Sequence, residues 1–471
     1  MSETESGTRS LRRLGMACLT LYAALAIFFW TAWSHNTRWI NDAVMIAATG
    51  ALGTLYFAGL KFVAQAPVTL IVMFAVGLGL VGFLMPPFDS TDVFFYMATG
   101  WQQAHYGANP YSASLRSLDA QNDPMIRNQW MTRNRNPWLD IPTPYGFLFT
   151  LLARGLAFLG DGNFWLTLDL FAFMNVLMHA GTAWLLWKAG KLLPDGSGKV
   201  MLYLYTWNPF VVLQYLADLH NDIIVAFLIV AAAYLLLKRQ SAWGLPLLVA
   251  AGLIKYVALV LVPFVLVSVV RQRKWKNGIQ AAAVSAGLIF ASAWPYAGEI
   301  GSFQYRLIWA QVSESTGSLH AFVMYTLRAA ARLWPPLMSS LADVGRLVQA
   351  GLWVLFAIFV VRELYVSWRD PDAPLMMIER WTLILFVLIF VASSQFYAWY
   401  LGMVLPLALL TRRRTILADC VIALSVAHML SFTFLRRKAI GYFLVATLLP
   451  VLYSAAESRR WRLRQIACSV H

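Results

Sequence analysis

Residues 67–85 read PVTLIVMFAVGLGLVGFLM and contain no charged side chain. A helix needs about 20 apolar residues to cross a bilayer, so this run predicts a transmembrane helix. Similar runs at about 14–33 and 41–60 predict two spans before it. Three arginines between residues 9 and 13 put the N-terminus on the cytoplasmic side under the positive-inside rule. By parity, the segment that begins at Pro86 is expected outside the cytoplasm.

The composition extends this prediction to the whole chain. Of its 471 residues, 60% are hydrophobic and only 13% are charged, whereas a soluble domain carries roughly 25% charged residues. The longest stretch without a convincing span covers residues 86–142, which is too short for a nucleotide-binding domain. The sequence therefore excludes an ordinary soluble protein and predicts a polytopic membrane protein.

The net charge of +15 is explained by the same prediction. Basic clusters lie at the ends of apolar runs, at residues 9–13, 271–276, 412–414 and 459–464, where cytoplasmic anchors are expected. We therefore expect membrane lipids, and no nucleic acid, as partners of these clusters. Cys18, Cys420 and Cys468 have no CxxC spacing, so neither a zinc site nor a disulfide framework is indicated.

The remaining apolar runs predict an all-α fold with about 11–14 transmembrane or re-entrant helices. The basic loop after residue 187 favours a short re-entrant or surface helix at 143–160. Residues 242–254 and 257–270 are each too short to span, and we expect them to form a broken hairpin joined by Lys255 and Tyr256. Further spans are expected at 164–187, 199–217, 222–237, 277–296, 341–361, 379–395, 398–411, 415–432 and 439–455, with an outer amphipathic helix at 319–334.

The outer segment FDSTDVFFY, residues 88–96, carries the first candidate chemistry. Ser90 is a good helix N-cap, and the next 15 residues suit an interfacial helix with Phe94, Phe95 and Trp101 toward lipid. Asp89, Asp92 and Tyr96 would share one helix face, and the helix dipole would favour ionised Asp92. An ionised carboxylate at a membrane surface can accept a proton from a sugar hydroxyl. The alternative is that both aspartates only cap the helix.

This segment is similar to a known family signature. Asp92-Val-Phe-Phe-Tyr96, then Gly100, then Gly107-Ala-Asn-Pro-Tyr111, resembles the D-V-x-x-Y…G…G-x-x-P-Y pattern of GT-C fold glycosyltransferases. The closest likeness is to polyprenol-phosphate-mannose-dependent α-mannopyranosyltransferases of bacterial envelope assembly. Four more motifs agree in order over roughly residues 80–410: Thr143-Pro-Tyr-Gly146, His220-Asn-Asp222, Lys255-Tyr256 with Pro263, and Gln395…Trp399-Tyr400…Pro406.

The resemblance implies an inverting hexosyltransferase, expected to transfer mannose, with a membrane-borne polyprenyl-phosphate sugar as donor and a glycan or glycolipid as acceptor. It implies Asp92 as the catalytic base, since this residue begins the motif, with Asp89 as a second candidate acid. We expect no cofactor and no metal, because fixed cations can meet the phosphate. The substrate-binding candidates that the resemblance implies are Tyr96, Tyr111, Tyr145, His220, Asn221, Asp222, Lys255, Tyr256, Gln395, Trp399 and Tyr400, and the outer loop itself adds Arg133 and Arg135.

Each of these candidates has a structural alternative. Asn221 or Asp222 can cap the following helix, Lys255 can extend to the interface, and Trp399 with Tyr400 can belong to the aromatic belt. In the functional interpretation, Lys255 contacts the carrier phosphate, and His220 and Asp222 form hydrogen bonds with sugar hydroxyls. Arg133 and Arg135 could also contact the phosphate, although a loop arginine is usually solvated.

Four segments follow from this interpretation. They are N-terminal transmembrane helices (1–85), an extracytoplasmic catalytic loop with an interfacial helix (86–142), a GT-C transmembrane core with the sugar and lipid-phosphate site (143–411), and C-terminal helices with a basic cytoplasmic tail (412–471). The expected location is a bacterial plasma membrane, with the active site on the outer side. The competing class is a secondary transporter or lipid-linked sugar flippase, which should show repeats and ionisable residues near the midplane.

Overall fold

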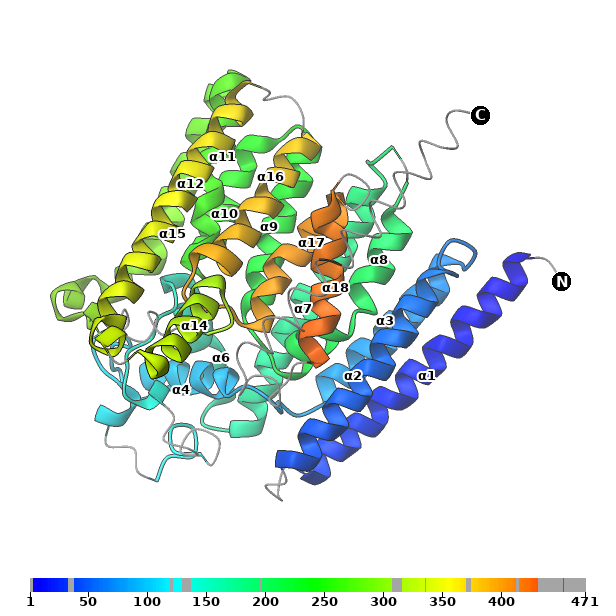
Figure 1. The fold of residues 1–471 in the computed structure, drawn as a ribbon, viewed down its shortest axis with the longest axis horizontal. Helices are drawn as coiled ribbons and strands as arrows, with labels where there is room; N and C mark the ends of the chain where they lie inside the picture. Colours follow the sequence, from blue (N-terminus) through cyan, green and yellow to red (C-terminus); the bar gives the residue numbers. More distant parts are fainter. Residues whose placement is uncertain are drawn as a thin grey trace. The chain divides into compact units, whose positions relative to one another are not determined.

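The computed structural model describes residues 3–32, 38–118, 122–128, 137–194, 196–306, 316–334, 336–369, 374–411, 415–430 and 452. These residues form helices joined by loops and no strand (Figure 1). Within them, six helices are long and apolar enough to cross a membrane, or up to seven if one bent pair counts as a span. The predicted all-α polytopic membrane fold is thereby confirmed.

The chain divides by its contacts into two compact units. Unit 1 comprises residues 1–82, 183–212 and 315–471, and unit 2 comprises residues 83–182 and 213–314. Both units therefore combine segments that are far apart in the sequence.

Unit 1 contains helices from both ends of the chain and one, α8 (Gly198–Thr206), from its middle, where the predicted span at 199–217 is interrupted after Thr206. They are α1 (Glu3–Ala32), α2 (Arg38–Leu60), most of α3 (Val68–Leu84), α8, α14 (Leu319–Leu333), α15 (Pro336–Arg369), α16 (Pro374–Val387), α17 (Leu401–Thr411) and α18 (Ile416–Leu430). Helix α17 packs against α16, α18 and α8, and α18 also packs against α2. Apart from residue 452, the predicted span at 439–455 lies outside the described residues.

A buried ion pair joins α15 and α16 of unit 1. Arg380 Nε lies 3.6 Å from Glu363 Oε2, with both side chains less than a tenth exposed. Arg362 pairs with the other carboxylate oxygen of Glu363, and Arg380 also donates to Ser367 Oγ at 3.0 Å. We call Arg380 and Glu363 the closed pair, because both carboxylate oxygens have a protein partner.

Unit 2 is built from shorter helices. They are α4 (Asp92–Ala104), α6 (Phe147–Gly160), the first part of α7 (Phe164–Gly190), a π-helical segment (Val211–Ala217), α9 (Asp222–Leu237), α10 (Gly244–Gly252), α11 (Val262–Arg271) and α12 (Trp275–Ala293). The bend between Val211–Ala217 and α9 is 115°. Helix α6 is too short to span, and Lys255 lies between α10 and a short turn before α11, as the sequence predicts.

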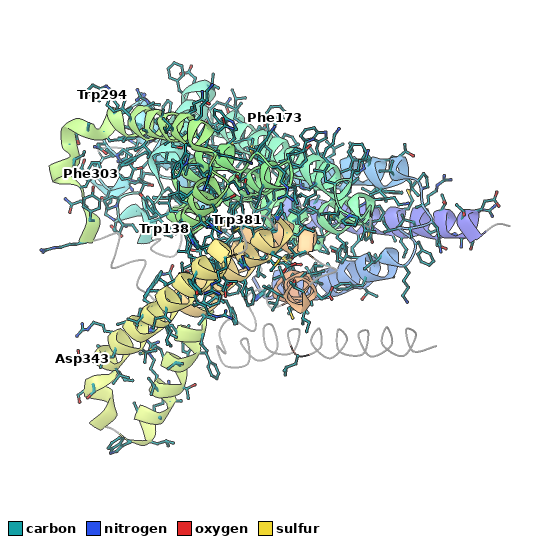
Figure 2. All side chains as sticks on the ribbon, turned by 90° about the horizontal axis from the view of Figure 1, so that it is seen from above. Trp138, Phe173, Trp294, Phe303, Asp343 and Trp381 are labelled. Atoms are coloured by element: carbon teal, nitrogen blue, oxygen red, sulfur yellow. The ribbon has the colours of Figure 1, made fainter. Side chains whose placement is uncertain are left out.

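Apolar side chains on the outside of the helices fit a lipid environment. Phe173 and Trp294 are 54% and 64% exposed, whereas Trp381 is fully buried (Figure 2). The burial of α4 contradicts one prediction, however. Phe94, Phe95 and Trp101 are buried against protein, with Phe94 stacked on Phe164 and Phe95 beside Trp138. Helix α4 is an internal element of unit 2, because its apolar residues meet α6 and the loops around it instead of lipid.

Two glycines allow this close packing. A Cβ on Gly100 of α4 would lie 2.2 Å from the Ala153 carbonyl oxygen on α6, and a Cβ on Gly146 would lie 2.3 Å from the Leu253 carbonyl oxygen. Both distances are far below van der Waals contact, so neither position accepts a larger residue without movement. The first glycine holds α4 on α6, and the second holds the start of α6 on the end of α10.

Candidate active site

Helix α4 places Asp92 in its first turn, as predicted, but its cap differs from the prediction. The residue at the N-cap is Thr91, which makes no side-chain cap bond. Ser90 Oγ instead accepts a hydrogen bond from the Asp92 N–H at 3.1 Å. The predicted capping role of Ser90 is therefore wrong by one position, because the first helical hydrogen bond closes onto the Thr91 carbonyl. Asp89 precedes the helix and is not part of its face.

Asp92 is held among polar groups that stabilise its ionised form. Its side chain is 14% exposed, and its Oδ2 atom lies 3.5 Å from His220 Nδ1. The Tyr96 hydroxyl donates to the same oxygen at 3.5 Å. Burial alone would raise the pKa of Asp92, but the hydrogen bond and charge of His220, the charge of Lys255 and the Ser90 hydrogen bond together lower it below its usual value.

A second carboxylate forms an ion pair beside Asp92. Lys255 Nζ lies 2.7 Å from Asp222 Oδ2; the Asp222 side chain is fully buried and that of Lys255 is 16% exposed. The other oxygen, Asp222 Oδ1, has no hydrogen-bond partner among the described residues, and neither has Asn221 Nδ2. We call Lys255 and Asp222 the open pair. Buried polar atoms without partners are costly, and a ligand with hydroxyl groups could satisfy these two.

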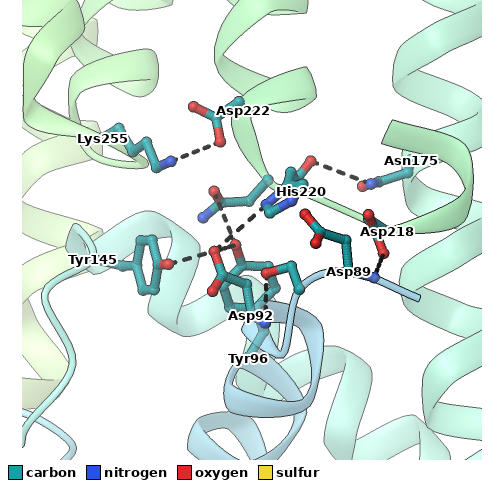
Figure 3. A network of polar contacts seen from close by, with 11 residues as sticks. Asp89, Asp92, Tyr96, Tyr145, Asn175, Asp218, His220, Asp222 and Lys255 are labelled. Carbon is teal, nitrogen blue, oxygen red and sulfur yellow. Dashed lines mark hydrogen bonds and ion pairs between the residues drawn. The ribbon is translucent and has the colours of Figure 1, made fainter. Parts of the chain in front are cut away.

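The break after α10 brings Tyr145 and Lys255 together. The Gly146 N–H donates to the Ile254 carbonyl at 3.1 Å, and the Leu148 N–H donates to the Leu253 carbonyl at 3.0 Å. Lys255 Nζ consequently lies 5.9 Å from the centre of the Tyr145 ring. The Tyr145 hydroxyl donates to the Tyr96 hydroxyl at 3.5 Å, and Asn221 Oδ1, 3.4 Å from the Tyr96 hydroxyl, is a second acceptor for its single hydrogen beside Asp92. Figure 3 shows the resulting cluster, in which side chains from separate segments of unit 2 converge.

Seven of the predicted site residues thus meet in one network: Asp92, Tyr96, Tyr145, His220, Asn221, Asp222 and Lys255. Asp89 lies at its edge, where Figure 3 shows its carboxylate between Asp218 and His220.

Two other candidates of unit 2 lie outside this network. Tyr111 packs with Phe147, Tyr296 and Phe303 in an aromatic cluster, and its hydroxyl donates to the Tyr145 carbonyl at 2.9 Å. This hydrogen bond helps to fix the position of the Tyr145 backbone. Tyr256 is 53% exposed and makes none of the contacts that join the cluster.

The remaining candidates belong to other parts of the chain. Gln395, Trp399 and Tyr400 are in unit 1, where the Trp399 ring stacks on Tyr397 at 4.6 Å. These rings and their neighbours form a short aromatic turn before α17. Arg133 and Arg135 lie outside the described residues.

The structure adds two residues that the sequence analysis did not include in the site. Asp218 Oδ1 accepts backbone hydrogen bonds from Phe88 and Asp89, and Asn175 Nδ2 of α7 donates to the carbonyls of Tyr215 and His220. A buried asparagine in an otherwise apolar run was the available signal for Asn175. For Asp218 the signal was a carboxylate close before the His220-Asn-Asp222 motif. Among the described residues, no three His, Cys, Asp or Glu side chains come together to hold a metal ion.

Comparison with known proteins gives a consistent family. A family model described as alpha-(1->6)-mannopyranosyltransferase, N-terminal domain, matches residues 18–271, which include the whole cluster from Asp89 to Lys255. Alpha-(1->6)-mannopyranosyltransferase A of Mycobacterium tuberculosis is 24% identical over 385 residues, covering 79% of this chain and 70% of that protein. The protein of the same name from Corynebacterium glutamicum is 22% identical over 237 residues, covering 49% of this chain and 46% of that protein.

No solved structure matches the chain significantly. The family model, however, covers more than half of the sequence. The chain therefore belongs to this family of mannosyltransferases.

Proposed function

We propose that the chain transfers mannose from a polyprenyl-phosphate donor to a glycan or glycolipid acceptor at the extracytoplasmic face of a bacterial plasma membrane. The family supports mannose transfer, and the finer parts of the proposal rest on the chemistry of the cluster. The observation that carries it is Asp92. This carboxylate is partly accessible, contacts His220 and has a lowered pKa, so it is ionised and able to accept a proton.

The proposed reaction is a single displacement at the sugar C1 atom. The acceptor hydroxyl gives its proton to Asp92 while its oxygen forms a bond to C1. The bond between C1 and the phosphate oxygen breaks, and the polyprenyl phosphate leaves with that electron pair. A phosphate needs no protonation in order to leave, so one carboxylate suffices, in contrast to the two carboxylates of glycosidases. Attack opposite the phosphate gives inversion.

The open pair supplies the complementary groups for the donor. A lysine ammonium has three donors, so Lys255 can contact a phosphate oxygen while it keeps its bond to Asp222. A positive charge placed there would stabilise the negative charge that develops on the leaving phosphate. Asp222 Oδ1 and Asn221 Nδ2, which have no partners in the described part of the chain, would bind sugar hydroxyls.

A lipid-borne donor agrees with the architecture. The described residues form helices and their connecting loops, without the parallel sheet of a Rossmann-type nucleotide domain. A donor that arrives within the bilayer needs no such domain. Unit 2 also carries its carboxylates in loops and at helix ends, whereas a transporter would be expected to hold ionisable groups near the midplane.

Transfer from purified polyprenyl-phosphate-mannose by the purified protein tests the proposal. A general base contributes about 10²- to 10⁴-fold, so Asp92→Asn should lower the rate by at least about 100-fold, while Asp89→Asn should retain more activity. GDP-mannose serves as the control donor and should not replace the lipid. Full activity of Asp92→Asn would contradict the role of Asp92. A chain that transfers from no prenyl-phosphate sugar, and instead moves such a lipid across vesicles, would contradict the proposal as a whole.

A further inference from the structure

The segment between the π-helical residues and α9 contacts the start of α4 at two points. The Asp218 side chain is fully buried, and its Oδ1 atom accepts the N–H groups of Phe88 at 2.8 Å and Asp89 at 3.0 Å. Two residues later, His220 Nδ1 lies 3.5 Å from Asp92 Oδ2. Asp218 thus holds the backbone that leads into α4, and His220 contacts the carboxylate that this backbone delivers (Figure 3).

The residue between them has an uncommon backbone conformation. Leu219 has φ +59°, in the left-handed region that is unfavourable for residues with a Cβ. Such conformations persist where the surroundings hold them, and they concentrate at functional sites. Here Asn175 donates to the carbonyls of Tyr215 and His220 on either side of Leu219, at 2.8 and 3.3 Å. The turn that separates Asp218 from His220 is therefore fixed by α7.

The hydrogen-bonding pattern of Asp218 distinguishes a positioning role from a chemical one. Both backbone N–H groups donate to Oδ1, whereas Oδ2 has no hydrogen-bond partner in the described part of the chain. An asparagine side chain has the same shape and keeps one carbonyl oxygen that could accept both bonds. The observed contacts of Asp218 therefore require a hydrogen-bond acceptor at this position but do not require a negative charge.

We propose that Asp218 is a positioning residue that holds the backbone of Phe88 and Asp89 so that Asp92 meets His220. This inference rests on the proposed role of Asp92 as the base. Asp218 takes no proton from the substrate and acts through the geometry of Asp92. The other charged or titratable groups around Asp92 belong to four segments and are Asp89, Tyr96, Tyr145, His220, Asp222 and Lys255.

The test compares Asp218→Ala and Asp218→Asn with Gln103→Ala in the full-length protein. Gln103 is a matched structural control on α4, because it is buried and makes three hydrogen bonds, to Thr99, Thr150 and Tyr296. It lies 11 residues after Asp92, or about 16 Å along the helix at about 1.5 Å per residue. Mannose transfer from the polyprenyl-phosphate donor and thermal unfolding in detergent are measured for each variant.

Positioning predicts that Asp218→Ala lowers kcat by about 100-fold, the size of effect that a misplaced catalytic group produces, with a smaller change in KM. The acid limb of its pH–rate profile should move to higher pH, because Asp92 loses the contact with His220 that favours its ionised form. Asp218→Asn should retain most of the rate and the wild-type profile. Gln103→Ala should unfold at a lower temperature but keep the wild-type acid limb.

Two results would overturn the inference. One is an Asp218→Asn variant as slow as Asp218→Ala, since the charge would then be required. The other is an Asp218→Ala variant with unchanged kcat and an unchanged profile. If Asp218→Ala does not fold, Asp218→Glu distinguishes the two roles. A positioning role predicts slow mannose transfer, because the longer side chain displaces the oxygen that accepts the backbone hydrogen bonds. An essential negative charge predicts a normal rate. If Asp92→Asn loses activity while Asp218→Ala transfers mannose normally, only the positioning role of Asp218 is contradicted. If Asp92→Asn remains active, the proposed function itself is contradicted.

Discussion

The open pair in unit 2 and the closed pair in unit 1 place the same chemistry in two different settings. Arg380 and Glu363 lie within continuous helices, and both oxygens of Glu363 meet a cation. Lys255 and Asp222 lie at a helix break and a helix start, and one oxygen of Asp222 has no partner among the described residues. A buried ion pair is weak evidence for stability by itself. Under the proposed function, the incomplete pair receives a ligand, whereas the complete pair serves the fold.

Removing each pair as a whole gives the largest expected difference. The double variant Lys255→Met, Asp222→Leu should have a kcat/KM at least about 100-fold below wild type. Loss of a single group that stabilises developing charge already lowers the rate by about 10²- to 10³-fold. The double variant Arg380→Met, Glu363→Leu should keep kcat/KM within a few-fold of wild type, because replacing a buried ion pair by apolar residues is often neutral for stability. Mannose transfer by the two double variants is the measurement.

The single variants serve as the controls for folding. Glu363→Leu alone should destabilise the protein by about 3–5 kcal/mol, because it leaves Arg380 buried without its carboxylate. The double variant should restore most of that loss in thermal unfolding. Equal activity in the two double variants would break the distinction between the open and the closed pair.

A smaller effect is expected from the helix break that carries the open pair. Gly146→Ala would place a Cβ 2.3 Å from the Leu253 carbonyl oxygen, and such overpacking typically costs about 1–3 kcal/mol. Gly155→Ala on the same helix is the matched control, because nothing lies within 4 Å of its added Cβ. That variant should be neutral or more stable by up to about 1 kcal/mol, the difference in helix propensity. Thermal unfolding and kcat are measured for both. Identical behaviour of the two alanine variants would show that the break tolerates displacement.

The smallest expected effect is a shift in pH dependence. Asp92 has a lowered pKa, so its ionised form should persist at neutral pH and activity should fall only as the pH drops through that lowered value. His220→Gln removes the His220 contact that lowers the pKa of Asp92, so the acid limb of kcat/KM should move to higher pH. The double variant of the closed pair should show the wild-type limb. An acid limb that moves to lower pH in His220→Gln would contradict the contact with Asp92.

Much of the helical pattern could be predicted from apolar runs alone. Runs at 67–85, 164–187 and 222–237 correspond to α3, α7 and α9, and the break at Lys255 lies where a charged residue interrupts two short runs. The environment of α4 could not be predicted in the same way. Phe94, Phe95 and Trp101 are equally suited to lipid and to a protein interior, and only the tertiary structure shows that they are buried.

The candidate site likewise contains residues that the sequence predicted and others that it did not. Motifs that follow the family's order along the sequence singled out Asp92, His220, Asp222 and Lys255, which the structure brings into one network. Asp218 was missed because its role depends on the backbone N–H groups of Phe88 and Asp89, about 130 residues earlier in the chain. Backbone donors carry no sequence signal, so a carboxylate before the His220 motif could be noticed in the sequence, but its role in binding these donors is visible only in the folded chain.

The start of α6 has a consequence for how this enzyme could change its anion preference. Many proteins bind phosphate through free N–H groups at a helix N-terminus. At α6 the N–H groups of Gly146, Leu148 and Phe149 already donate to the carbonyls of Leu253 and Ile254. An anion beside Tyr145 would therefore be recognised by side chains and not by the helix. Recognition through a side chain can be changed by one substitution, so under the proposed function position 255 is the place where evolution or engineering could alter the headgroup that the site accepts.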